Sequence, residues 1–253
     1  MNRPTTAYKS NIGQIVRSLL VADFTTQYRR GRAVFASYLV PIILLFAWRK
    51  AADKLGGAFV VTSSLSIGLI SIGLFGYSVS LAQDRAKGIF QRLRVTPAPT
   101  WAIMISRLAV QLASIVTMTI VVLVGALLID NVQVGVLPAI ATVFSAVIGG
   151  VVFLSLGQAI VALVASVDAV NSVARFAYIA LVVVGIIGSF GVLGDTGKTI
   201  VEWSPYGTLQ IMLQAALQAS AWSRQIWEAL FANLGYAIVF AAIGISYFRW
   251  NVE

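Results

Sequence analysis

The chain has 253 residues, of which 59% are hydrophobic and 11% charged, and its formal net charge is +9. This composition excludes a soluble globular domain, because charge-free apolar stretches of about 20 residues, long enough to cross a bilayer, recur along the chain. Backbone groups in hydrocarbon must be satisfied internally, so these stretches are predicted to be helices, and the alternating pattern of a membrane barrel is absent. We therefore expect an all-α polytopic membrane protein with a single domain over residues 1–253.

The first 32 residues are predicted to form a cytoplasmic tail that holds an amphipathic helix. Apolar residues recur there at helical spacing, with polar residues on the other faces: Ile12, Ile15, Val16, Leu19, Leu20 and Phe24. A helix that lies in the membrane interface on this apolar face fits the pattern, and a solvated tail helix is the alternative. The tail is too polar to contain the apolar core of a signal peptide.

Residues 33–253 are predicted to form the membrane bundle. Six apolar stretches qualify as transmembrane helices, at residues 33–48, 55–82, 108–129, 136–167, 176–194 and 229–248. The first is short for a bilayer, and the fourth is long enough to tilt or to project from it.

The distribution of basic residues predicts the orientation of the bundle. With the N-terminus inside, thirteen bases fall on the cytoplasmic side: Arg3, Lys9, Arg17, Arg29, Arg30, Arg32, Arg85, Lys87, Arg92, Arg94, Arg107, Arg175 and Arg249. Five fall outside: Arg49, Lys50, Lys54, Lys198 and Arg224. The positive-inside rule then places both termini in the cytoplasm, as expected for a multi-pass protein of a bacterial inner (plasma) membrane. Bases in the tail and loops indicate contact with anionic membrane lipids and no nucleic acid partner.

A basic segment, QDRAKGIFQRLRVTPAPT at residues 83–100, separates the second and third apolar stretches. Read as a helix, it carries Ile89, Phe90 and Leu93 on one side and its bases elsewhere, and the Thr96–Pro99 stretch ends it because proline cannot continue a helix. A short amphipathic helix at the cytoplasmic mouth of a bundle predicts a docking site for a partner. The candidate docking residues are Asp84, Arg85, Lys87, Ile89, Phe90, Arg92, Leu93 and Arg94.

Residues 203–223 are uncharged but do not resemble a simple membrane span. Pro205 and Gly207 interrupt the stretch early, and Gln210, Gln214 and Gln218 then form a polar stripe. Such a helix fits a re-entrant element on the outer side of the bundle, before the last span. If it crossed the membrane instead, the C-terminus would lie outside.

The sequence offers no chemistry for an enzyme or for nucleotide binding. It has no histidine and no cysteine, and residues 191–199, GVLGDTGKT, miss the glycine spacing of a phosphate-binding loop. The six stretches contain no ionisable residue of the kind that couples transport to an ion gradient. An ion-coupled secondary transporter or channel stays open as an alternative, because broken helices can bind sodium through backbone carbonyls. A non-transporting assembly scaffold is also open.

The segment LAQDRAKGIFQRLRVTP at residues 81–97 resembles the first cytoplasmic loop of ABC-type-2 transporter permeases. In that family an acidic–basic pair, a glycine, a helix ending in Leu-Arg and a Thr-Pro pair follow the second span. Here Asp84 stands where the family often has glutamate, and Ile89–Phe90 stand where Thr-Leu is common. The interfacial helix, the six spans and the re-entrant element extend the resemblance over essentially the whole chain.

The resemblance implies the membrane subunit of an ATP-driven exporter. Such permeases work as pairs, here with a second copy of this chain or a homologous permease, and with a separate nucleotide-binding ATPase subunit that binds ATP and Mg. The basic loop would be the coupling helix that docks on the ATPase, with Phe90 and Leu93 among its apolar anchors. Without docking, its bases would serve topology alone and its apolar side would rest on lipid. This chain itself is expected to be non-catalytic.

Family members line the transport path mainly with spans two and five. The corresponding candidates are Ser64, Ser66, Ser71, Tyr77, Ser78, Phe176 and Tyr178, although small residues at these spacings are also typical of helix packing. The Leu-Arg-Val-Thr-Pro loop is similar to that of drug exporters, which favours a hydrophobic or amphipathic, drug-like or lipid-like cargo. The Tyr28–Arg29–Arg30–Gly31 run is similar to that of lipid-linked polysaccharide exporters, which remain the alternative.

Overall fold

The computed structural model describes residues 12–29, 31–50, 56–94, 99–130, 134–190, 194–221 and 223–247. Within these ranges the chain forms helices and their connections, and no strand occurs. The helices are α1 (Ile12–Arg29), α2 (Gly31–Ala47), α4 (Gly57–Ile70), η1 (Ser71–Gly76), α5 (Tyr77–Ala86), α6 (Ile89–Arg94), α7 (Thr100–Asp130), α8 (Val136–Leu163), α9 (Val167–Ser189), α10 (Gly194–Glu202), α11 (Pro205–Leu217) and α12 (Arg224–Ser246).

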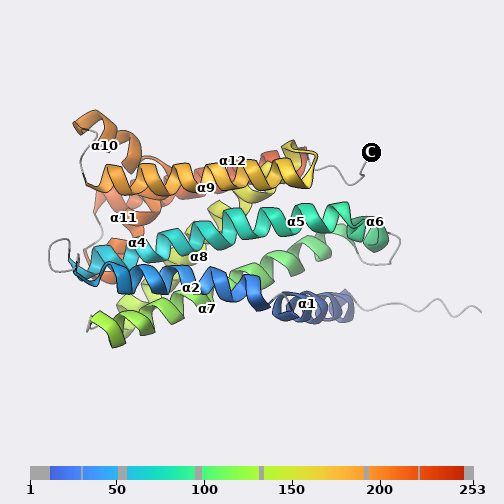
Figure 1. The fold of residues 1–253 in the computed structure, drawn as a ribbon, viewed down its shortest axis with the longest axis horizontal. Helices are drawn as coiled ribbons and strands as arrows, with labels where there is room; N and C mark the ends of the chain where they lie inside the picture. The colour runs from blue at the N-terminus through green and yellow to red at the C-terminus, as the bar shows by residue number, and fades with distance from the viewer. Residues whose placement is uncertain are drawn as a thin grey trace, which may run out of the picture.

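The long helices run side by side along one axis of the molecule (Figure 1). The short helices gather at the two ends: α1 and α6 lie at one end and α10 and α11 at the other (Figure 1). We call these the α6 end and the α10 end. Helices α10 and α11 stay at one end between α9 and α12, and their re-entrant placement in a membrane stays a prediction.

In the part of the chain that the structure describes, five helical segments are long and apolar enough to cross a membrane: Gly57–Ala86, Ala102–Leu128, Val136–Leu163, Val167–Gly188 and Arg224–Ser246. The first segment joins α4, η1 and α5 into one rod of 30 residues. The chain is therefore an all-helical, multi-pass membrane protein. The remaining expected span, residues 33–48, falls on α2, in which the side chains of Tyr38–Ala47 are described and form a short apolar helix. A sixth crossing stays a prediction.

The boundary between the fourth and fifth spans differs from the one we expected. The fourth helix ends at Leu163 and not at residue 167, because Val164 adopts an extended conformation with φ −109° and ψ 127°. The fifth begins at Val167 and not at residue 176, and Ser166 caps it by accepting the Ala169 N–H at 3.2 Å. The span thus includes Asp168 in its first turn.

The helix expected in the basic segment, from residue 83 up to the Thr96–Pro99 stretch, is divided in the structure. Residues 83–86 form the last turn of α5, and Gly88 then takes φ +67°, a conformation that glycine adopts without strain. Only Ile89–Arg94 form the separate helix α6. The next helix, α7, starts at Thr100, and residues 95–98 lie outside the described ranges.

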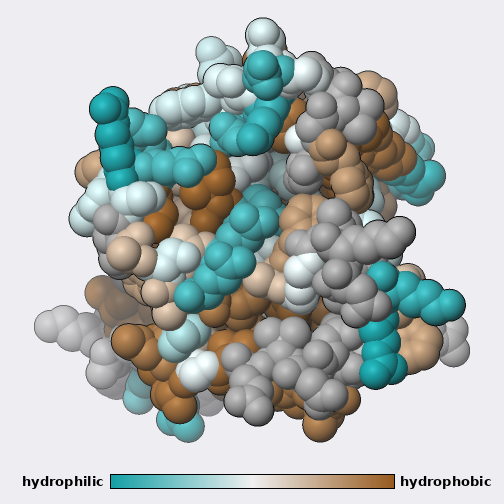
Figure 2. All heavy atoms as spheres, turned by 90° about the vertical axis from the view of Figure 1, so that its left-hand side faces the viewer, coloured by the Kyte–Doolittle hydropathy of each residue, from teal (hydrophilic) through white to brown (hydrophobic). Residues whose placement is uncertain are grey.

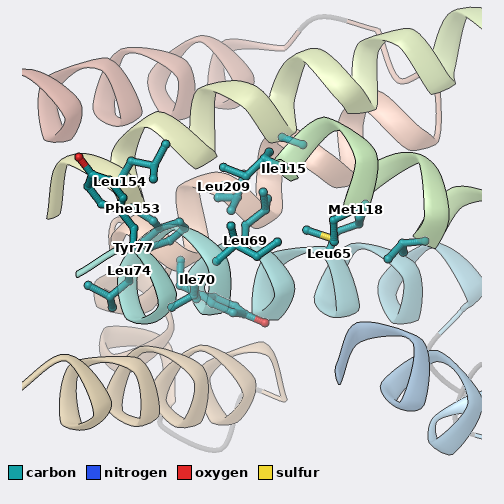
Figure 3. Close-up of a cluster of buried hydrophobic side chains, with 14 of the residues drawn as sticks. Leu65, Leu69, Ile70, Leu74, Tyr77, Ile115, Met118, Phe153, Leu154 and Leu209 are labelled. Atoms are coloured by element: carbon teal, nitrogen blue, oxygen red, sulfur yellow. The ribbon is translucent and has the colours of Figure 1, made fainter. Parts of the chain in front are cut away.

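The second span forms the centre of the bundle. The most apolar stretch of this span is 78% buried within the chain, whereas the most apolar stretches of α9 and α12 are each 17% buried. Figure 3 shows how its side chains meet those of three neighbouring helices. Leu65, Leu69, Ile70, Leu74 and Tyr77 of the rod pack in one cluster with Ile115 and Met118 of α7, Phe153 and Leu154 of α8, and Leu209 of α11. A movement of this rod would therefore displace every helix that packs on it.

Two glycines bring the backbone of η1 close to that of α8. A Cβ atom added to Gly157 would lie 2.9 Å from the carbonyl oxygen of Gly73 and 3.1 Å from that of Leu74. A Cβ atom added to Gly73 would lie 2.9 Å from the Phe153 Cβ. The π-helical turn of the rod is thus held against α8 at a distance that only glycine permits, as in other close helix pairs in membranes.

The Gly157→Ala variant is expected to lower the free energy of unfolding by about 1–3 kcal/mol, because a backbone oxygen cannot yield as a flexible side chain does. Thermal unfolding of the detergent-solubilised chain measures the loss. Gly235→Ala on α12 is the matched control, since a Cβ atom there meets nothing within 4 Å. Equal melting temperatures for the two variants would contradict the close-contact interpretation.

Candidate functional site

Asp84 and Arg85, the last ionisable residues of the second span, contact different helices. Both are buried, with 4% and 5% of their surface exposed. The carboxylate of Asp84 accepts a hydrogen bond from Arg107 of α7 at 2.6 Å, and the two side chains form an ion pair that is shielded from solvent. This pair fixes the end of α5 to α7.

The guanidinium of Arg85 lies at the C-terminal end of α8. It donates hydrogen bonds to the backbone carbonyls of Val161 at 2.6 Å, Val164 at 2.7 Å and Ala165 at 2.5 Å. The last carbonyls of a helix have no partner within it, and they form the negative end of its dipole. The planar, five-donor guanidinium satisfies the Val161 carbonyl of the last turn and, at the same time, the Val164 and Ala165 carbonyls that follow the helix. Arg85 therefore fixes α5 to the connection between α8 and α9.

We call Asp84, Arg85, Arg107 and these three carbonyls the α5 junction. The link from the junction to α6 is short and continuous in hydrogen bonding, because the Gly88 N–H donates to the Arg85 carbonyl at 3.0 Å and the Arg92 N–H donates to the Gly88 carbonyl at 3.1 Å. A force on α6 would thus reach α7, α8 and the connection between α8 and α9 through the junction.

The expected docking residues fall into two groups. Lys87 and Arg92 are exposed and Ile89 is half-buried, whereas Asp84 and Arg85 are buried and bonded within the chain. The last two are consequently not part of a free surface, and their partners within the chain were not predicted from the sequence. The side chains of Phe90, Leu93 and Arg94 lie outside the described residues, although their backbone belongs to α6.

The expected path residues of the second span are mostly buried. Ser64, Ser66, Ser78 and Tyr77 are at most 2% exposed, and Ser71 is half-buried. The Ser66 hydroxyl contacts the Thr62 carbonyl at 2.9 Å and the Gln210 side-chain oxygen at 2.8 Å, and Ser78 donates to the Phe75 carbonyl at 3.1 Å. These contacts are typical of helix packing.

The two expected path residues of the fifth span lie nearer the surface. Phe176 is 75% exposed, and Tyr178 is half-buried with its ring 6.3 Å from that of Phe75. Tyr178 thus lies beside the second span, whereas Phe176 faces outward. Whether they line a path between two chains stays a prediction.

The polar stripe expected on α11 divides between the core and a cleft. Gln210 is buried, and its amide donates to Thr62 at 2.9 Å and Ser63 at 3.0 Å, which ties α11 to α4. Gln214 and Gln218 line a cleft of about 500 Å³ together with α10 and the start of α12. Figure 2 shows hydrophilic side chains across this end of the molecule, with hydrophobic ones between them.

The segment that resembled a phosphate-binding loop is part of α10. Lys198 lies on this helix, 3.8 Å from Glu202 one turn later, and not in a glycine-rich loop. Residues 191–193 lie outside the described ranges. Among the described residues, no group of three or more His, Cys, Asp or Glu side chains could hold a metal ion.

The N-terminal helix packs on α7 through part of its predicted apolar face. Ile15, Val16, Leu19 and Leu20 are half-buried, whereas Ile12 and Phe24 are about half exposed or more. The carboxylate of Asp23 accepts a hydrogen bond from Ser106 of α7. Helix α1 is thus attached to the bundle beside the α5 junction, and its contact with lipid stays a prediction.

A comparison with known protein families agrees with this architecture. Residues 14–206 match the family model described as ABC-2 type transporter, which covers α1, all helices up to α10 and the start of α11. No curated protein sequence matches the chain.

Proposed function

We propose that this chain, which belongs to the ABC-2 type transporter family and is therefore the membrane component of an ABC transporter, is the permease of an ATP-driven exporter. The family normally works with a nucleotide-binding ATPase subunit. In our proposal that subunit is a separate chain, it binds ATP and Mg, and this permease contributes no catalytic residue. The protein would lie in a bacterial inner membrane with both termini in the cytoplasm.

The α5 junction carries the proposal. In the proposed mechanism, α6 is the coupling helix and docks on the ATPase through Lys87, Ile89, Phe90, Arg92, Leu93 and Arg94. Closure of the ATPase would move α6, and the short Lys87–Gly88 link would pass the movement to Arg85 and Asp84. Because these residues bond to α7, to α8 and to the connection between α8 and α9, the movement would rearrange the bundle as a unit between inward and outward states.

A second copy of the chain would complete the transporter. Helix α9 leaves large apolar side chains exposed along its length, namely Val173, Phe176, Ile179, Val183, Val184 and Ile187. In our proposal part of this surface contacts the second permease and part contacts lipid. The path between the copies would then expose the fifth-span candidates Phe176 and Tyr178, with a hydrophobic or amphipathic, drug-like or lipid-like cargo.

Transport into inside-out vesicles tests the exporter. The chain is reconstituted with its ATPase, and the uptake of fluorescent amphipathic cargo is followed with ATP, with a non-hydrolysable analogue, and with an ion gradient alone. Uptake that needs both the ATPase and hydrolysable ATP would support the proposal. Uptake driven by an ion gradient without the ATPase would overturn it in favour of a secondary transporter.

A further inference from the structure

A second cavity, of about 240 Å³, lies between α1, α5 and α7 at the α6 end. Its polar lining includes Asp23 from α1, Tyr77 and Asp84 from the rod, and Arg107 and Gln111 from α7. A polar cavity inside an otherwise apolar bundle is costly unless its groups are satisfied. The polar groups that line this cavity therefore need hydrogen-bond or charge partners.

The charges that line the cavity do not balance. Two carboxylates, Asp23 and Asp84, face it with one guanidinium, Arg107. Arg107 is 2.6 Å from Asp84, whereas Asp23 accepts from the neutral hydroxyl of Ser106. Among the residues that the structure describes, no base forms an ion pair with Asp23, so the lining has an excess negative charge.

A buried hydroxyl in the same wall also lacks a partner. Tyr77 is 2% exposed, and its Oη makes no hydrogen bond within the described part of the chain. A phenolic oxygen can accept a hydrogen bond as well as donate one. The carboxylate of Asp23 and this oxygen together offer acceptors for a ligand that carries several N–H donors.

The rest of the wall is mostly apolar, with Thr26, Gln27 and Ser80 as its further polar residues. Leu19 from α1, Leu81 from α5, and Ile103 and Val110 from α7 line the cavity beside the polar groups. A ligand that fits both parts has a positive head and a hydrocarbon tail. We propose that this cavity is a binding site for an alkylammonium group, with the ammonium at Asp23 and Tyr77 and the alkyl chain against these four residues.

Two sources could supply an alkylammonium group: a soluble amphipathic amine, or the ethanolamine headgroup of a phospholipid. Both share the ammonium, which a carboxylate in a partly desolvated cavity binds more strongly than it would in water. The cavity lies beside the α5 junction and shares Asp84 and Arg107 with it, so a ligand there would contact the residues that hold α5 against α7.

Calorimetric titration of the purified full chain in maltoside detergent, which has no ammonium group, tests the site. The probes are n-hexylammonium and the neutral n-hexanol. The chain is expected to bind n-hexylammonium saturably and at least about tenfold more tightly than n-hexanol, because only the charged head pairs with Asp23. No saturable binding, or equal binding of both probes, would overturn the site.

Three variants locate the binding. Asp23→Asn is expected to weaken n-hexylammonium binding at least about tenfold, since it removes the charge and keeps the shape. Tyr77→Phe, which retains the ring, is expected to weaken n-hexylammonium binding severalfold. This variant tests the site if Asp23→Asn fails to fold. Asp168→Asn, the same change at an exposed position in the first turn of α9, is the matched control. Unchanged affinity in both cavity variants would overturn the proposal.

Added phospholipid then distinguishes the two sources. Displacement of n-hexylammonium by phosphatidylethanolamine, but not by phosphatidylglycerol at the same mole fraction, would support the site and identify a lipid headgroup as its ligand. Absence of displacement by either lipid, with saturable amine binding retained, would support a soluble amine. The titration contains no ATPase or ATP, so its outcome is independent of the proposed export.

Discussion

The Arg85→Met variant is expected to remain folded and bound to the ATPase but to lose ATP-driven transport by at least about tenfold. Methionine fills a similar volume but donates no hydrogen bond. The carbonyls of Val161, Val164 and Ala165 would lose their shared donor. A loss of coupling free energy of about 1.4 kcal/mol already corresponds to a tenfold effect, so the loss of one of these bonds suffices.

The same substitution is expected to lower the free energy of unfolding by about 3 kcal/mol, because hydrogen bonds to charged groups contribute about 1.5–3 kcal/mol each and the carbonyls stay buried. Arg85→Lys is expected to recover only part of this loss, since a compact ammonium cannot reach three carbonyls as a planar fork does. Co-purification with the ATPase, transport in vesicles and thermal unfolding are measured together for each variant.

Arg224→Met provides the matched control. Arg224 lies at the start of α12, its side chain is 92% exposed, and it pairs with Glu228 at 2.7 Å. An exposed pair of this kind contributes at most about 1 kcal/mol, so the control is expected to transport normally. Normal transport and stability in Arg85→Met as well would contradict the role given to the junction.

Hydropathy in the sequence predicted the helices of the bundle well, because the need to satisfy backbone groups in hydrocarbon leaves no other structure for long apolar stretches. The helix ends were harder to predict. Between α8 and α9 the apolar run continues through Val164 and Val167, and the break depends on one capping serine, Ser166. Ser166 was the residue in the sequence that could have indicated this helix start. The prediction followed hydropathy instead and therefore placed the boundary wrongly.

The partners of Asp84 and Arg85 could not be read from the sequence. Arg107 is 23 residues from Asp84, and the carbonyls that bind Arg85 are 76 to 80 residues away. Only tertiary packing decides whether such a pair points outward to a partner protein or inward to other helices. The position of both residues at the end of an apolar span was the one hint of an internal role, since charges near the hydrocarbon region need partners.

The serines proposed for the transport path illustrate a different limit. A hydroxyl in an apolar helix stands out in a sequence, but Ser66 contacts the Thr62 carbonyl one turn earlier and the Gln210 amide of α11. Local bonding of this kind satisfies a serine without any cargo. Composition alone therefore does not separate a path from a packing surface, and the arrangement of two copies decides between them.

Replacing both Phe90 and Leu93 with aspartate is expected to abolish co-purification of the permease with its ATPase. The prediction rests on the sequence pattern of the loop alone, in which residues 89, 90 and 93 fall on one side when the segment is read as a helix. Docking would place the new carboxylates in an apolar groove of the partner, where an unpaired charge is costly. An association at least about tenfold weaker is expected, with insertion and thermal unfolding of the permease alone unchanged, because no span is altered.

Two further α6 variants separate apolar docking from a general effect of charge. Gln91→Asp adds a negative charge at an exposed position of the same short helix and is expected to leave most of the association intact. Arg92→Gln, also exposed, is expected to weaken association modestly and mainly at low salt, as charges at the rim of an interface do. If the double-aspartate variant still bound the ATPase and transported normally, the bases of this loop would act only in topology, and coupling would have to enter the bundle elsewhere.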